Sequence, residues 1–117
     1  MLIVAAVLFA LAAVVGVTMA YTHFTHAKNP PDGVALFHGV LAGAGLAVLI
    51  VGLIQLGATM VTAWSVGLFT VAALGGFILL SYQVRRVRLP SPVVVIHAVV
   101  AVVAFVLLLA ALWPAVQ

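Results

Sequence analysis

The sequence contains no cysteine and very little charge. Only 4% of its 117 residues are charged, and Asp32 is the single acidic residue. The lack of cysteine excludes disulfides, thiolate metal sites and iron–sulfur clusters. A soluble domain has about a quarter of its residues charged, so this chain cannot build a water-facing surface, and lipid must be its main solvent. One carboxylate also disfavours hydrolytic chemistry, which needs paired or orienting acids.

Long apolar runs take the place of the missing charge, since 68% of the residues are hydrophobic. A membrane-spanning helix needs about 20 residues, and the sequence predicts helices over residues 2–22, 34–55, 60–82 and 93–113. The uncharged stretch 34–82 is too long for one span, so we place a turn at residues 55–59. Residues 2–22 lack the basic start of a signal peptide and exceed its apolar core in length, so we interpret them as a retained span. We therefore expect an all-α integral membrane protein, one four-helix transmembrane domain over residues 1–117.

The cations predict the orientation in the membrane. Lys28, Arg85, Arg86 and Arg88 are the only lysines and arginines, and they fall in the two loops on one side of the membrane. The positive-inside rule makes these basic loops cytoplasmic and both termini external. We expect the cytoplasmic (inner) membrane of a prokaryote. The sequence pI near 10.3 reflects four cations on an apolar body, and it does not indicate nucleic-acid binding.

The two halves of the chain resemble each other. When the second half of the sequence is shifted onto the first by a constant number of positions, equivalent residues align: Pro31 with Pro90, His38 with His97, Gly16 with Gly75, and Ala42 with Ala101. Each half predicts one helical hairpin, so the hairpins form a parallel tandem repeat with a pseudo-two-fold axis along the membrane normal. His38 and His97 then lie at one depth, on helix faces that otherwise carry small residues and leucine. A histidine facing lipid is costly, so both should face the bundle interior.

Two imidazoles at one depth can bind one metal from opposite sides, as the axial ligands of a haem do. Gly16 and Gly75, at about the same depth on the other helices, leave room for a flat ring. Ala42 and Ala101, one turn inward from each histidine, keep the packing close to that ring. The cationic loop residues Arg85, Arg86 and Arg88 lie where the acid groups of a haem would emerge, and arginine binds carboxylates through a bidentate fork.

This pattern resembles membrane b-type cytochromes, which hold haem between histidines on the second and fourth helices of a four-helix bundle. Glycines on the first and third helices make room for the ring in that family. His38, His97, Gly16 and Gly75 match these positions, and the resemblance spans the whole chain. Two-haem members carry a second histidine further along each ligand helix, where this chain has Gly52 and Ala111. The resemblance therefore implies one haem b per chain, on the basic side.

We expect a membrane electron-transfer protein that is not an enzyme by itself, a small cytochrome subunit that exchanges electrons with quinone or with a partner in a larger membrane complex. The alternative is a cofactor-free structural or assembly subunit of such a complex, whose small-residue faces, such as Gly39 and Gly43, grip neighbouring helices. A transporter is disfavoured because the predicted spans contain no Asp, Glu, Lys or Arg. His23 and His26 could bind a metal, lie at the interface without a special role, or, for His26, approach a propionate or a quinone head group.

Overall fold

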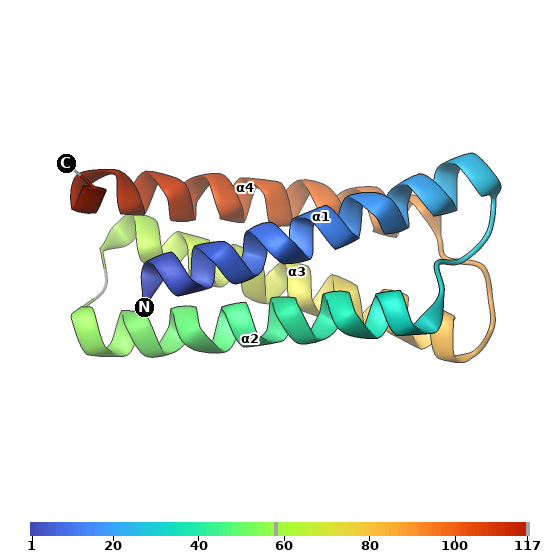
Figure 1. Ribbon diagram of the computed structural model, residues 1–117, viewed down its shortest axis with the longest axis horizontal. Coiled ribbons are helices and arrows are strands. Elements are labelled where there is room, and N and C mark those ends of the chain that lie inside the picture. The colour runs from blue at the N-terminus through green and yellow to red at the C-terminus, as the bar shows by residue number, and fades with distance from the viewer. Residues whose placement is uncertain (58, 117) are drawn as a thin grey trace.

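The computed structural model describes residues 1–57 and 59–116, the last three by their backbone alone. These residues form four helices and no strand: α1 (Leu2–His26), α2 (Asp32–Leu56), α3 (Met60–Val84) and α4 (Ser91–Val116). The helices lie side by side in a bundle of 43 × 22 × 22 Å (Figure 1). Each is long and apolar enough to cross a membrane, and the bundle length matches a bilayer with its head groups, about 40–45 Å. The prediction of an all-α transmembrane bundle is confirmed.

The helices continue past the predicted bounds at the end that carries the basic loops. α1 and α3 end at His26 and Val84, and α2 and α4 begin at Asp32 and Ser91. The prediction placed these ends at the first polar residues, but polar side chains near the membrane interface still pack within a helix. The predicted turn at residues 55–59 falls between α2 and α3, and Ala58 itself lies outside the described residues.

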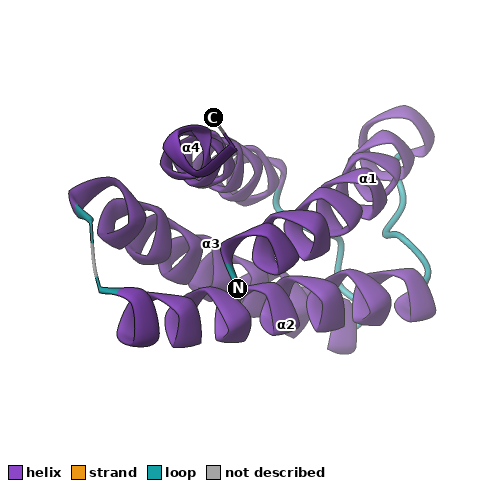
Figure 2. Ribbon diagram, turned by 60° about the vertical axis from the view of Figure 1, so that its left-hand side comes forward, coloured by secondary structure: helices purple, strands orange, loops and turns teal. Residues whose placement is uncertain are grey.

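The bundle consists of two hairpins related by a pseudo-two-fold axis along its length. α1 packs mainly on α2 and α3 mainly on α4, while smaller interfaces join α2 to α3 and α1 to α4 (Figure 2). α1 therefore faces α3 across one diagonal, and α2 faces α4 across the other. The tandem-hairpin arrangement predicted from the repeat is the one observed.

Two equivalent polar contacts tie the hairpins together at the basic end. His23 Nε2 lies 2.9 Å from Ser91 Oγ, which joins α1 to α4. Gln83 Nε2 donates to Asp32 Oδ1 at 2.6 Å, which joins α3 to α2. In the sequence, Gln83 follows His23 at a distance one position longer than that from Asp32 to Ser91. The shift between equivalent residues is therefore one position longer for α1 and α3 than for α2 and α4.

Two phenylalanines fill the centre of the bundle. Phe9 and Phe69 stack across the α1–α3 diagonal with ring centroids 3.6 Å apart and planes 2° from parallel. Gly45 on α2 permits this stack, because a Cβ there would lie 3.3 Å from the Phe9 ring. Leu49 and Leu108, fully buried on α2 and α4, belong to the same core. Inside a membrane such close packing, more than the hydrophobic effect, holds helices together.

We expect Phe9→Ala to lower the free energy of unfolding by about 3 kcal/mol, because the substitution leaves a cavity against the Phe69 ring. Unfolding by sodium dodecyl sulfate in mixed micelles, followed by circular dichroism, measures the change. Phe77→Ala is the matched control, because Phe77 is 67% exposed on the outer face of α3. Equal losses in the two variants would contradict the central role of the stack.

Candidate functional site

His38 and His97 face each other across the α2–α4 diagonal. Their ring centroids are 6.2 Å apart and their planes are inclined by 73°. His38 Nδ1 lies 2.9 Å from the Ala12 carbonyl oxygen on α1. His97 Nδ1 lies 2.8 Å from the Ala72 carbonyl oxygen on α3. Each ring is therefore held by a backbone group of the other helix in its own hairpin.

These bonds determine the tautomer of each neutral imidazole. A carbonyl oxygen only accepts hydrogen bonds, so Nδ1 must carry the proton and donate it. The lone pair is then on Nε2. Neither Nε2 of His38 nor Nε2 of His97 has a hydrogen-bond partner among the described residues. In metal-binding histidines the N–H of the second ring nitrogen commonly donates a hydrogen bond to a carbonyl or carboxylate, which fixes the ring and raises the basicity of the ligating nitrogen. Both histidines have this arrangement.

The ring separation suits one shared metal ion. An imidazole nitrogen binds a first-row transition metal at about 2 Å, and the ring centre lies roughly 1 Å further on, so two ligands in line have ring centres about 6 Å apart. The observed separation of the His38 and His97 centroids is 6.2 Å. In residues 1–57 and 59–116 no three His, Cys, Asp or Glu side chains gather into a metal site. The site therefore offers two imidazole donors to any group that it could hold.

Glycines on α1 and α3 give the histidine rings their space. A Cβ built on Gly16 would lie 3.1 Å from His38 Cε1, closer than side chains ordinarily pack. On α3, a Cβ on Gly76 would lie 3.5 Å from His97 Cε1, and one on the predicted Gly75 would lie 3.5 Å from His97 Nδ1. Both α3 glycines therefore border His97, and Gly76 is the structural counterpart of Gly16.

Gly76 was not predicted from the sequence, because the two halves of the chain were aligned with a single constant shift. Ala12 and Gly16 on α1 correspond to Ala72 and Gly76 on α3 in their contacts with the histidines. The shift that relates these helices is one position longer than the shift from His38 to His97. The Gly75–Gly76 pair was the available signal, since either glycine could have matched Gly16.

The small residues predicted next to the histidines lie on the inner faces of α2 and α4. Ala42 and Ala101 are half-buried, one turn beyond His38 and His97. Further along the same faces, Gly45 and Ala104 are buried. The histidine faces therefore point into the bundle along their length, as their pattern of small residues and leucine predicts.

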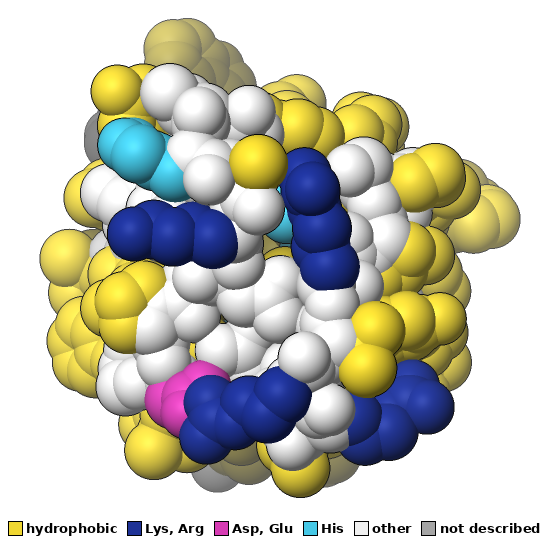
Figure 3. Space-filling model, turned by 90° about the vertical axis from the view of Figure 1, so that its right-hand side faces the viewer, with side chains coloured by type: hydrophobic (Ala, Val, Ile, Leu, Met, Phe, Trp, Pro, Cys, Tyr) yellow, Lys and Arg dark blue, Asp and Glu magenta, His cyan; other side chains and the backbone are white. Residues whose placement is uncertain are grey.

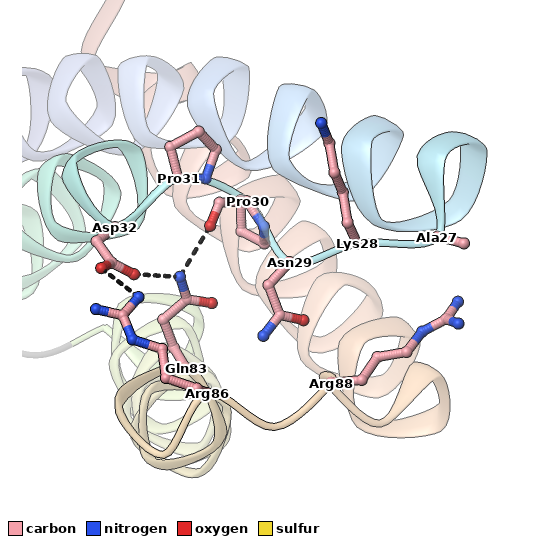
Figure 4. A pocket seen from close by; sticks show the side chains of 9 residues that line it. All are labelled: Ala27, Lys28, Asn29, Pro30, Pro31, Asp32, Gln83, Arg86 and Arg88. Carbon is pink, nitrogen blue, oxygen red and sulfur yellow. Dashed lines mark hydrogen bonds and ion pairs between the residues drawn. The ribbon is translucent and has the colours of Figure 1, made fainter.

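The three predicted arginines do not share one location. Arg86 forms an ion pair with Asp32, with Nη1 and Oδ2 2.6 Å apart, and both side chains are exposed. Arg85 turns back along α3, where its guanidinium bonds the Ser81 carbonyl and lies 4.9 Å from the centre of the Tyr82 ring. Arg88 lines a cavity at the basic end together with Arg86 and Lys28, and Arg85 is not among the lining residues (Figure 4).

Buried residues close the bundle on the basic side of the histidine pair. They include two equivalent pairs, His23 with Gln83 and Pro30 with Leu89. His23 is 1% exposed and lies two helical turns beyond Gly16 on the same face of α1. Its Nδ1 is buried without a hydrogen-bond partner among the described residues, as is Gln83 Oε1. His26, in contrast, is exposed and packs edge-on against Tyr21.

Neither partner of this closing layer could be assigned from the sequence. His23 was expected either to bind a metal together with His26 or to lie at the interface without a special role, and Gln83 carried no signal beyond its position in a polar segment. Comparisons of the chain with protein-family models, curated proteins and solved structures found no match. Function is therefore inferred from the geometry of the site.

Proposed function

We propose that this protein is a membrane electron-transfer protein that holds one b-type haem between His38 and His97. One observation carries the proposal. The two rings are 6.2 Å apart, and each has its Nδ1 bonded to a carbonyl oxygen, which leaves Nε2 as the ligating nitrogen. When bound, the iron supplies reversible one-electron chemistry. The resemblance of the histidine and glycine positions to membrane b-type cytochromes supports the same function.

The surrounding residues would orient the cofactor and exclude water from it. Gly16 and Gly76 place no side chain against the His38 and His97 rings, so these rings pack directly on α1 and α3. The Phe9–Phe69 stack lies on the side toward the termini and separates the site from the rest of the core. On the basic side, the unpartnered Nδ1 of His23 would be available for a hydrogen bond with an acid group of the ring. Arg86 and Arg88 lie beyond it, where they would add positive potential.

The position of the site limits how electrons would travel. The histidine pair lies nearer the basic end than the terminal end, so one cofactor there does not span the bilayer. We propose that the basic loops face the cytoplasm of a prokaryotic cell, as the positive-inside rule predicts. Electrons would then be exchanged at this face with a quinone or with a partner subunit of a larger membrane complex.

A cofactor-free structural or assembly subunit is the second candidate. It is favoured by Gly39 and Gly43, one turn apart on the outer face of α2, where a Cβ would meet no atom within 4 Å. Small residues on an exposed face let another membrane helix approach closely. The exposed glycine pair requires no cofactor, so it could take part in assembly whether or not the protein binds haem.

The visible spectrum of the purified protein distinguishes the two candidates. We expect protein expressed with ample haem supply to show a sharp low-spin b-type difference spectrum between its reduced and oxidised forms. A pyridine extract should yield one haem b per chain. Colourless protein, or pigment far below one per chain, would contradict the cytochrome and favour the structural subunit.

A further inference from the structure

The basic end of the bundle carries a cavity of about 570 Å³ whose lining includes three cations and one carboxylate. The polar residues of this basic-end cavity are Lys28, Asn29, Asp32, Gln83, Arg86 and Arg88. Figure 3 shows dark-blue cationic side chains spaced around a pale hollow at this end of the molecule. Asp32, the only acidic residue of the chain, is already paired with Arg86. Lys28 and Arg88 are therefore left to attract an anion.

A second cavity of about 290 Å³ shares part of its lining with the first. This lateral groove runs between α2 and α3, and its walls are aliphatic: Ala35, Leu36, Leu80 and Val84. It shares Asp32, Gln83 and Arg86 with the basic-end cavity. Leu36 and Val84 are 67% and 71% exposed on the face that lipid would cover. A cationic hollow and an apolar groove on the lipid-facing side thus share a wall formed by Asp32, Gln83 and Arg86.

Gln83 provides a buried hydrogen-bond acceptor at the junction of the two cavities. Its side chain is 7% exposed, and its Nε2 donates to the Pro30 carbonyl oxygen and to Asp32 Oδ1. These two bonds fix the amide, so Oε1 is the atom without a partner among the described residues. Figure 4 shows Oε1 directed away from Asp32, toward the Asn29 side of the cavity. A buried acceptor is costly when left unpaired, so a ligand with a hydrogen-bond donor, such as a hydroxyl group, would stabilise this position.

We propose that the basic-end cavity and the lateral groove together bind an anionic glycerophospholipid whose head group carries a hydroxyl. The positive charges of Lys28 and Arg88 attract the phosphate, Gln83 Oε1 accepts the hydroxyl hydrogen, and an acyl chain lies in the lateral groove. Basic pockets between membrane helices are known to take anionic lipid head groups. A choline or ethanolamine ammonium group would be repelled by the surplus positive charge. The site does not depend on a cofactor at His38 and His97.

The test measures lipid binding to the purified full-length chain after delipidation in detergent. Native mass spectrometry with short-chain lipids should show saturable binding of phosphatidylglycerol at least about tenfold tighter than that of phosphatidylcholine. Phosphatidylmethanol has the same charge but no head-group hydroxyl, so it should bind several-fold more weakly. Inorganic phosphate and glycerol 3-phosphate should fail to compete at the same concentrations, because they have no chain for the groove.

Substitutions with a matched control test the site itself. Lys28→Gln combined with Arg88→Gln should weaken phosphatidylglycerol binding about tenfold or more. Arg85→Gln is the matched control for Arg88→Gln, because each removes one cation but Arg85 does not line the cavity; Arg88→Gln should weaken binding several-fold, and Arg85→Gln should leave it unchanged. Equal losses in Arg85→Gln and Arg88→Gln, or equal binding of phosphatidylcholine, would overturn the proposal. Competition by inorganic phosphate would replace the lipid with a soluble phosphate ligand, and full binding of phosphatidylmethanol would overturn the hydroxyl contact.

Discussion

His38→Ala and His97→Ala are each expected to reduce the haem content of the purified protein to less than about a tenth of the wild-type value. Loss of a partner that only orients a metal-binding histidine costs 10–100-fold in metal affinity, so loss of the ligand itself should cost at least as much. The content per chain is measured from the pyridine extract. Any residual pigment should lose its low-spin spectrum, because the iron would keep one protein ligand.

Controls separate this effect from misfolding. Each substitution removes one hydrogen bond to a carbonyl oxygen, with a net cost of about 1 kcal/mol, so helix content and elution volume should not change. His26→Ala should keep its pigment, because His26 is exposed and packs against Tyr21, away from the pair. Added imidazole should partly restore pigment to both alanine variants. Wild-type pigment in either His38→Ala or His97→Ala would disprove shared ligation.

The fold could be predicted because a lipid solvent leaves few choices. A chain with 4% charged residues must satisfy its backbone within helices, and short connections between spans make consecutive helices antiparallel neighbours. The spacing of small residues and leucine from His38 and from His97 predicted which faces of α2 and α4 point inward. Helix ends were less certain, because His23 and Gln83 are polar yet buried within α1 and α3.

The details of the candidate site depend on tertiary contacts that the sequence does not encode locally. The carbonyl partners of His38 and His97, on Ala12 and Ala72, are backbone groups and leave no trace in residue identity. The separate directions of Arg85 and Arg86 follow from the chain reversal after α3, where Arg86 adopts a left-handed conformation with φ of 58°. Three arginines close in sequence therefore do not act as one cluster.

The glycine next to His38 gives the second large expected effect. Gly16→Val should lower haem content by about tenfold, within the range of 1–3 kcal/mol that overpacking costs. The reason is that a Cβ at Gly16 would already lie 3.1 Å from His38 Cε1. The His38 ring cannot move away without breaking its bond to the Ala12 carbonyl oxygen. Haem content per chain and the low-spin spectrum of purified protein measure the effect.

Two comparisons make this prediction specific to the site. Gly39→Val adds the same side chain to a helix glycine with open space around it, so its haem content should match the wild type. Gly16→Ala should impair haem binding more than Gly75→Ala, because the added Cβ is 3.1 Å from the ring in one case and 3.5 Å in the other. Equal pigment in Gly16→Val and Gly39→Val would mean that ring space beside His38 does not control cofactor binding. The fit of a flat ring between α1 and α3 would then have to depend on residues other than Gly16.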